Sequence, residues 1–200
     1  MVKCSKPMRN TFALFVLHFS LCMNLAVFNA LHAVANISPF TDAVILFVAD
    51  YLPFLLFFVL LVYEGWQWMK GRRARARELL RAIGVAGFAW LIAEALKGLV
   101  ASPRPFLVIE HLKPLIRHGG YNAFPSGHVT FFFALGVALL LSGKRALGTI
   151  FMAAAFVMGL ARVAAGIHWP IDVLGGILLG SSVVLLAKSG GYLKTKHQQA

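Results

Sequence analysis

Three short polar segments interrupt a chain that is otherwise mostly apolar. Together they contain two histidines, one aspartate, a serine next to a glycine, and three cationic side chains. Imidazoles can act as nucleophiles or proton donors, and fixed cations beside a helix amino terminus bind phosphate groups. In the segments KGLVASPRP, FPSGHVTFF and ARVAAGIHWPIDV, the candidate residues are Lys97, Arg104, Ser126, Gly127, His128, Arg162, His168 and Asp172.

The third segment is predicted to open a helix at Pro170, a residue that suits the first helical turn. Asp172 should then lie near His168, one turn away along the same face. A carboxylate in this place can fix the imidazole tautomer and leave the other ring nitrogen exposed as a nucleophile or base. The alternative is a purely structural His–Asp pair, with Trp169 as an anchor at the membrane interface.

The second segment has the pattern of a helix start. Ser126 is the expected N-cap, and Gly127 would let a ligand approach the backbone N–H groups at the positive end of the helix. His128 would stand in the first turn, beside any anion bound there. A capping role explains the serine alone but not the histidine that follows it.

The first segment places one cation at the end of an apolar stretch and another between two prolines. Pro103 and Pro105 restrict the backbone around Arg104 and would hold it at a fixed distance beyond the helix end. The alternative is that Lys97 and Arg104 only contact lipid headgroups.

Long apolar stretches must position these segments. Of the 200 residues, 60% are hydrophobic and 13% are charged, which is typical of an integral membrane protein. Backbone groups in lipid have to be satisfied internally, so the stretches should be helices. We predict an all-α polytopic membrane helix bundle, with one domain over 1–200 and the motifs in 97–172. The six predicted spans are Thr11 to Ala35, Thr41 to Tyr63, Leu79 to Val100, Val129 to Leu141, Ala146 to Leu160 and Pro170 to Ala187.

The net charge of +12 is unevenly distributed. With six spans, most Lys and Arg residues fall at the termini and in the loops after spans two and four, which share one side. The positive-inside rule then places both termini in the cytoplasm and the three polar segments at the outer boundary. The basic run KGRRARAR is interpreted as a loop that contacts headgroups, with no nucleic-acid partner. The basic residues on the predicted inner side are Lys3, Lys6, Arg9, Lys70, Arg72, Arg73, Arg75, Arg77, Arg81, Lys144, Arg145, Lys188, Lys194 and Lys196.

Two of the spans have features of their own. The basic start of the first span and the small residues near its end resemble a signal peptide. Its polar residues His18, Asn24 and Asn29 would also allow it to lie partly in the membrane interface. In the sixth span, the stretch GGILLG offers a face of small residues that we expect to pack within the monomer.

The polar segments predict phosphate chemistry without a metal. Asp172 is the only one of the 7 acidic residues that falls within these motifs, so no carboxylate cluster suits Mg²⁺, and we expect neither a metal nor another cofactor. Three cations and a helix start could hold a phosphate dianion or its transition state. One histidine could attack phosphorus while the other protonates the leaving oxygen. The expected activity is that of a metal-free phosphohydrolase.

These residues resemble the three signature motifs of the type-2 phosphatidic acid phosphatase superfamily, which includes vanadium haloperoxidases. The motifs occur in order as Lys97-x6-Arg104-Pro105, Pro125-Ser126-Gly127-His128 and Arg162-x5-His168-x3-Asp172. Ala161 departs from the pattern, since many members have serine there, but no charged group is lost.

The resemblance implies a role for each motif residue. His168 would be the nucleophile that forms a phosphohistidine, and Asp172 would orient it. His128 would protonate the leaving group. The phosphoryl oxygens would be held by Lys97, Arg104, Ser126, the Gly127 backbone and Arg162.

The early segment SPFTDAVILFVADYLPFLL and the compact chain resemble bacterial undecaprenyl pyrophosphate phosphatases of this superfamily. That likeness implies a multi-pass protein of the bacterial inner membrane, with its site facing the periplasm or exterior. It would produce the undecaprenyl phosphate used in cell-wall synthesis and need no obligatory protein partner. Phosphatidic acid, phosphatidylglycerol phosphate and lipid A are alternative substrates.

Other functions share some of these features. A phosphotransferase would share every motif, and a polyprenyl phosphate transporter would need the cations but not two histidines with an orienting carboxylate. A vanadate-dependent peroxidase is disfavoured by the small six-span chain.

The loop 106–124 could contact a second phosphate, although a solvated loop is the favoured interpretation. Asp50 and Glu94 lie within spans, and Glu94 could pair with Lys97 one turn away.

Overall fold

The computed structural model describes residues 12–116 and 120–193, and its regular elements are helices. The terminal basic residues Lys3, Lys6, Arg9, Lys194 and Lys196, and Arg117 and His118 of the loop, lie outside the described residues. The elements are α1 (Phe12–His32), α2 (Pro39–Leu46), the π-helix η1 (Phe47–Tyr51), α3 (Leu52–Met69), α4 (Arg73–Leu99), α5 (Pro105–Val108), α6 (Gly127–Leu141), α7 (Arg145–Ala164) and α8 (Pro170–Ser189).

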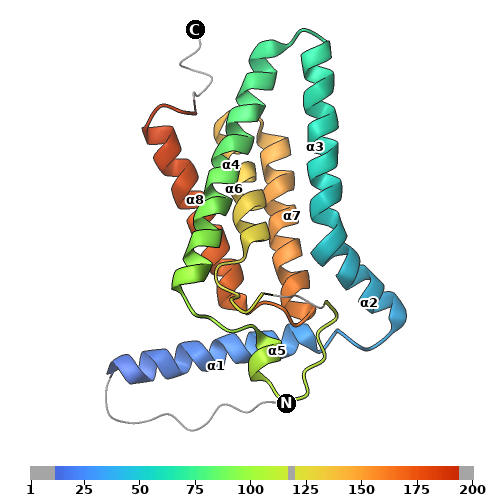
Figure 1. Cartoon of the computed structure of the whole chain (residues 1–200), viewed down its shortest axis with the longest axis vertical. Coiled ribbons are helices and arrows are strands. Elements are labelled where there is room, and N and C mark those ends of the chain that lie inside the picture. Colours follow the sequence, from blue (N-terminus) through green and yellow to red (C-terminus); the bar gives the residue numbers. More distant parts are fainter. Residues whose placement is uncertain (1–11, 117–119, 194–200) are drawn as a thin grey trace.

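Long apolar helices form a bundle in which α6 is central (Figure 1). In the described part of the chain, four helical stretches are long and apolar enough to cross a membrane: Pro39–Met69, Arg73–Leu99, Arg145–Ala164 and Pro170–Ser189. The shorter apolar helix α6 packs against α4, α7 and α8. Many large apolar side chains on the outer helices are exposed, as expected of a surface that faces lipid. The chain is an all-helical membrane protein.

Helix α1 has a different orientation from the other long helices. It lies across the end of the bundle where α7 ends and α8 begins, whereas α3, α4, α6, α7 and α8 run along the bundle (Figure 1). The first predicted span corresponds to α1, and the other five correspond to helices of the bundle. The count of six crossings and the side of each terminus therefore stay predictions.

Glycines allow α7 and α8 to approach α6 closely. A β-carbon at Gly176 would lie 2.9 Å from the carbonyl oxygen of Ser126, and one at Gly180 would lie 2.7 Å from the carbonyl oxygen of Thr130. On the other side of α6, a β-carbon at Gly148 would lie 2.7 Å from the Gly136 carbonyl oxygen. The small-residue face of α8 thus packs within the monomer, as predicted.

Candidate active site

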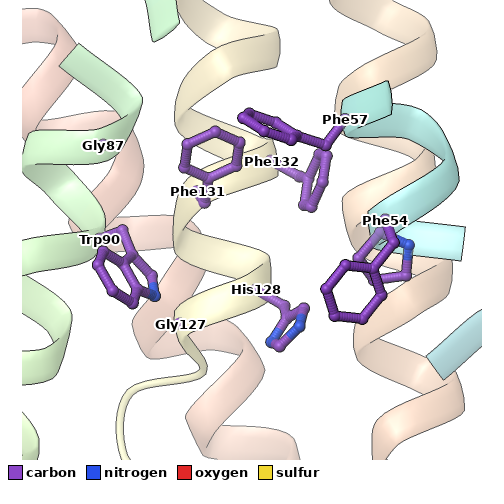
Figure 2. A pocket seen from close by; sticks show the side chains of 9 residues that line it. Phe54, Phe57, Gly87, Trp90, Gly127, His128, Phe131 and Phe132 are labelled. Atoms are coloured by element: carbon purple, nitrogen blue, oxygen red, sulfur yellow. The ribbon is translucent and has the colours of Figure 1, made fainter. Parts of the chain in front are cut away.

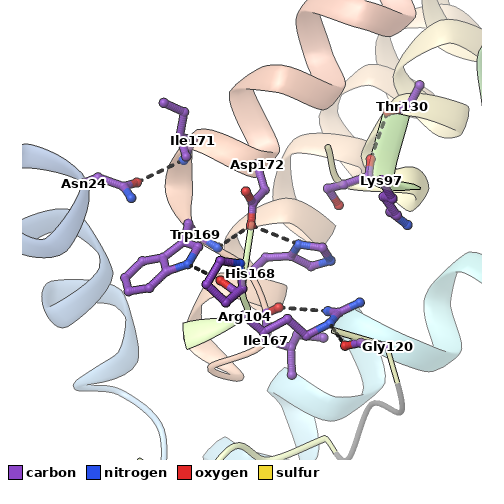
Figure 3. A network of polar contacts seen from close by, with 12 residues as sticks. Asn24, Lys97, Arg104, Gly120, Thr130, Ile167, His168, Trp169, Ile171 and Asp172 are labelled. Carbon is purple, nitrogen blue, oxygen red and sulfur yellow. Dashed lines mark hydrogen bonds and ion pairs between the residues drawn. The ribbon is translucent and has the colours of Figure 1, made fainter. Parts of the chain in front are cut away.

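The predicted site residues gather at one end of the bundle. They come from the end of α4 and the segment after it, the start of α6, the end of α7, and the turn that leads into α8. Figure 3 shows how the turn before α8 meets Arg104 and α1 at this end.

The turn between α7 and α8 holds His168 and Asp172 together, as predicted. Gly166 adopts a positive φ of 80°, which turns the chain at the end of α7. The carboxylate oxygen Oδ2 of Asp172 accepts the backbone N–H of Trp169 at 2.7 Å and lies 3.2 Å from Nδ1 of His168. Because a proton on Nδ1 would face the carboxylate, the lone pair of Nε2 is left for chemistry.

His168 is buried and surrounded by positive charge. It is 2% exposed, and Asp172 is 0% exposed. Burial lowers the pKa of His168 well below its usual value of 6.5, and the charges of Arg162, Arg104, Lys97 and His128 lower it further. The imidazole is therefore neutral at pH 7, which is the form able to act as a nucleophile or a base. These electrostatic interactions show that the predicted cations Lys97, Arg104 and Arg162 lie around the imidazole ring.

Arg104 is held by the backbone on two sides. Its Nε donates to the carbonyl of Gly120 at 2.7 Å, and one terminal nitrogen donates to the carbonyl of Ile167 at 2.9 Å. Ile167 directly precedes His168, so this bond ties the cation to the turn that carries the imidazole. Burial lowers the pKa of Arg104, while the carboxylates of Asp172 and Glu94 raise it. A guanidinium stays protonated in proteins, so Arg104 is a fixed cation.

Arg162 lies deeper, at the end of α7, and is 1% exposed. One terminal nitrogen donates to the carbonyl of Ala49 at 2.8 Å, and the guanidinium interacts electrostatically with Asp50. Both partners belong to the π-helix η1. π-Helical turns inside α-helices occur often at functional sites. Sequence reasoning placed Asp50 in a span but did not identify it as a neighbour of Arg162, because a π-helical turn has no distinct sequence signature.

The start of α6 packs against the start of α8, which carries Asp172. Ser126 occupies the N-cap position, as predicted, but its side chain makes no capping hydrogen bond. Its hydroxyl oxygen is buried without a hydrogen-bond partner among the described residues, and its backbone N–H donates to the carbonyl of Asp172 at 3.0 Å. A buried hydroxyl and the N–H groups of the first turn are thus available to a ligand at this helix start.

Lys97 and its neighbours complete this end of the site. The ammonium of Lys97 lies 2.7 Å from Oε1 of Glu94, so the pairing suggested by their spacing is present. A side-chain N–H of Asn122 donates to the backbone carbonyl of Lys97, which links the end of α4 to the loop before α6. Within the described residues, no group of three or more His, Cys, Asp or Glu side chains could hold a metal ion.

An apolar cavity of about 360 Å³ opens beside the helix start. Figure 2 shows His128 and Gly127 at one end of this cavity, with phenylalanines from α3 and α6 and Trp90 from α4 around it. Gly87 leaves space on the α4 side. The lining residues are Pro53, Phe54, Phe57, Gly87, Trp90, Gly127, His128, Phe131 and Phe132.

Helix α1 supports the turn that carries His168, a role that the sequence did not suggest. The side-chain oxygen of Asn24 accepts the backbone N–H of Ile171 at 3.1 Å, in the first turn of α8. Phe28 packs against Trp169 with ring centroids 5.1 Å apart, and Trp169 donates its indole N–H to the carbonyl of Pro103 at 2.9 Å. Asn24 was noted only as a polar residue in an apolar stretch, since nothing in its spacing indicates its partner.

Known proteins share both the sequence pattern and the fold. The family model described as the PAP2 superfamily matches residues 78–195. The chain is 30% identical over 158 residues to the undecaprenyl-diphosphatase BcrC of Bacillus subtilis, covering 78% of each chain. It is 30% identical over 161 residues to the putative undecaprenyl-diphosphatase YbjG of Escherichia coli, covering 79% of this chain and 77% of that one.

A solved structure agrees with this fold. The transmembrane PAP2-type phosphatidylglycerolphosphate phosphatase from Bacillus subtilis superposes with a TM-score of 0.67 at 22% identity, over 89% of each chain. The residues that the family model matches, 78–195, include the three polar segments. The chain belongs to the PAP2 superfamily.

Proposed function

We propose that this protein is a lipid phosphatase that converts undecaprenyl pyrophosphate to undecaprenyl phosphate. The observation that carries the proposal is the buried, neutral imidazole of His168, which Asp172 holds among three fixed cations and a helix start. Simple binding of phosphate needs the cations alone, whereas a nucleophile needs the oriented neutral ring. The family membership and the relatives named undecaprenyl-diphosphatase support the same proposed activity.

In the proposed mechanism, Nε2 of His168 attacks the terminal phosphorus and the bond to the bridging oxygen breaks. His128 gives its proton to that oxygen, which leaves with the lipid monophosphate. Water then attacks the phosphohistidine, with His128 as the base, and releases inorganic phosphate and free His168. The phosphoryl oxygens are held by Lys97, Arg104, Ser126, the Gly127 backbone and Arg162, a set that stabilises the charge of the transition state.

The aromatic cavity supports a lipid substrate. It begins at His128, the proposed proton donor, and continues between apolar side chains of α3, α4 and α6 (Figure 2). A phosphate bound at the start of α6 would therefore have an apolar path for the chain attached to it. Phenyl and indole faces suit the unsaturated, branched units of a polyprenyl chain. Phosphatidic acid, phosphatidylglycerol phosphate and lipid A remain the alternative substrates, and a phosphotransferase the alternative reaction.

The distribution of charge supports a site on the outer face of the bacterial inner membrane. The turn between α3 and α4 and the turn between α6 and α7 contain Lys70, Arg72 and Lys144, and both turns lie at the end of the bundle opposite the site (Figure 1). Basic residues favour the cytoplasmic side. Tyr121 beside the site is 60% exposed, so Tyr121→Cys should react with an impermeant reagent in intact cells. Reaction only after permeabilisation would reverse this orientation.

The position of the amino terminus depends on α1. The six-span prediction, with both termini in the cytoplasm, requires α1 to cross the membrane, and its position across the bundle end supports an interfacial helix on the site side instead. An epitope tag placed before Met1 distinguishes the two arrangements. Antibody access in intact cells supports the interfacial helix, whereas access only after permeabilisation supports six spans.

A substrate panel tests the proposed function. Purified protein in EDTA is given undecaprenyl pyrophosphate, phosphatidic acid, phosphatidylglycerol phosphate or lipid A, and released phosphate is measured. We expect the highest kcat/KM with undecaprenyl pyrophosphate and no release by His168→Ala. Equal release by the wild-type protein and His168→Ala would refute the phosphatase proposal, and binding without release would favour a transporter.

A further inference from the structure

Glu94 places a negative charge at the anion site itself. A β-carbon built on Gly127, the first residue of α6, would lie 2.8 Å from Oε1 of Glu94 and 3.3 Å from Nζ of Lys97. It would also lie 3.2 Å from Nε1 of Trp90. The carboxylate of Glu94 is therefore in contact with the start of α6, beside the N–H groups proposed to bind phosphate.

The mechanism proposed above does not use this carboxylate. A negative charge next to a phosphate dianion weakens the binding of that dianion, so Glu94 opposes the cations around it. Its side chain is 40% exposed, while that of Lys97 is 20% exposed, so the carboxylate is the more accessible partner of the pair. It can therefore move away from Gly127 while Lys97 stays at the site.

We propose that Glu94 is an internal anion that substitutes for phosphate in the free enzyme. Its carboxylate occupies the space beside Gly127 and holds Lys97 in position. The substrate phosphate displaces it, and after hydrolysis its return to Lys97 helps to expel inorganic phosphate. The inference rests on the proposed function for the identity of the site, and it makes Glu94 a positioning residue that sets the affinity for product.

The chain contains a matched ion pair at the opposite end of the bundle. The ammonium of Lys144 lies 2.6 Å from Oε2 of Glu78, with side-chain exposures of 20% and 22%. This pair is also a lysine–glutamate contact of similar length, with an equally exposed lysine and a less exposed glutamate, and it is remote from the helix start at Gly127. Glu78→Gln is therefore a control for the loss of one carboxylate charge from a surface ion pair.

The variant Glu94→Gln keeps an oxygen that can accept a hydrogen bond from Lys97 but removes the charge. We expect its inhibition constant for inorganic phosphate to fall about tenfold, which corresponds to roughly 1.4 kcal/mol. The value of kcat should fall because phosphate leaves more slowly, and KM should fall as well. Glu78→Gln should leave all three quantities unchanged. A phosphate affinity in Glu94→Gln that is equal to or weaker than that of the wild type would overturn the inference.

A binding measurement separates this inference from the proposed function. Phosphate affinity is also determined without substrate, by titration calorimetry of the purified wild type, Glu94→Gln and Glu78→Gln. Tighter binding by Glu94→Gln alone supports the inference even if no lipid is hydrolysed, in which case only the proposed function fails. Hydrolysis by the wild type with unaltered phosphate binding in Glu94→Gln refutes the inference and leaves the function standing. If none of the three proteins binds phosphate, the inference is refuted as well.

Discussion

The substitution Asp172→Asn probes how the carboxylate acts on His168. One oxygen of Asp172 serves both the backbone N–H of Trp169, at 2.7 Å, and Nδ1 of His168, at 3.2 Å. The amide oxygen of asparagine can occupy the same place and accept both bonds, so the shape of the turn is preserved. What is lost is the negative charge that stabilises positive charge on the imidazole when Nε2 carries the phosphoryl group.

The size of the effect follows from these two bonds. A hydrogen bond to a charged group contributes about 1.5–3 kcal/mol, whereas a neutral one contributes about 0.5–1.5 kcal/mol. Replacing two charge-assisted bonds with neutral ones in a fully buried site therefore costs about 2–3 kcal/mol. If the loss falls on the transition state, the single-turnover rate decreases by roughly 30-fold to 160-fold, since each 1.36 kcal/mol is about tenfold.

Phosphate release from undecaprenyl pyrophosphate under single-turnover conditions measures this effect directly. Size-exclusion chromatography in detergent checks that the variant is folded. Asp42→Asn is the matched control, because Asp42 also accepts a backbone N–H, from Asn36 at 2.8 Å, but is outside the predicted site. A rate for Asp172→Asn within threefold of the wild type would refute the role given to the carboxylate.

Three further predictions concern the nucleophile, α1 and the packing of α8. Burial and the surrounding cations keep the pKa of His168 below 6.5, so the ring of the free enzyme stays neutral as the pH falls to 6.5. The acid limb of kcat/KM should therefore lie below that pH, and an acid limb at or above 6.5 would contradict this. Asn24→Leu removes the acceptor for the N–H of Ile171 and should lower kcat about fivefold with KM unchanged. Asn24→Asp keeps an acceptor and should restore kcat. Equal rates for the two variants would exclude the capping role. Gly176→Leu forces a side chain against the carbonyl of Ser126 and should destabilise the protein by about 1–3 kcal/mol. This loss is measured as a lower Tm in detergent. An unchanged Tm would show that α8 can move aside.

The sequence was sufficient to predict the contacts that depend on local helix geometry. His168 and Asp172 were placed one turn apart because proline opens α8, and the structure confirms their contact. The small-residue face of α8 was also predicted correctly, because glycines spaced four apart lie on one face of a helix. These features depend on local geometry, which residue types and spacing determine.

The helix bounds show where hydropathy alone is insufficient. The third span was predicted to begin at Leu79, but α4 begins at Arg73. Arginine and alanine are good helix formers and no proline interrupts them, so the helix continues beyond the apolar stretch. Hydropathy also did not determine the orientation of α1, because an apolar stretch of this length suits a helix that crosses the membrane. Only tertiary contacts, such as that of Asn24 with α8, show that α1 lies across the bundle end.

Other features of the site depend on contacts between distant segments. The carbonyl of Ala49 reaches Arg162 from a π-helical turn, and the carboxylate of Glu94 meets the start of α6. Neither contact has a signature in spacing, because each joins helices whose relative rotation is set by packing. Ser126 shows the converse case: its type and position indicated a cap, but the structure leaves its hydroxyl without a capping bond.

Trapping of a phosphoenzyme tests the central claim most directly. Undecaprenyl pyrophosphate labelled with ³²P in its terminal phosphate is mixed with purified protein, and the reaction is stopped in alkali within milliseconds. We predict protein-bound label that survives alkali, is released by acid, and is absent from His168→Ala. Label of the same amount on His168→Ala, or turnover by the wild type with no labelled protein at any time, would contradict the assignment of His168 as the nucleophile.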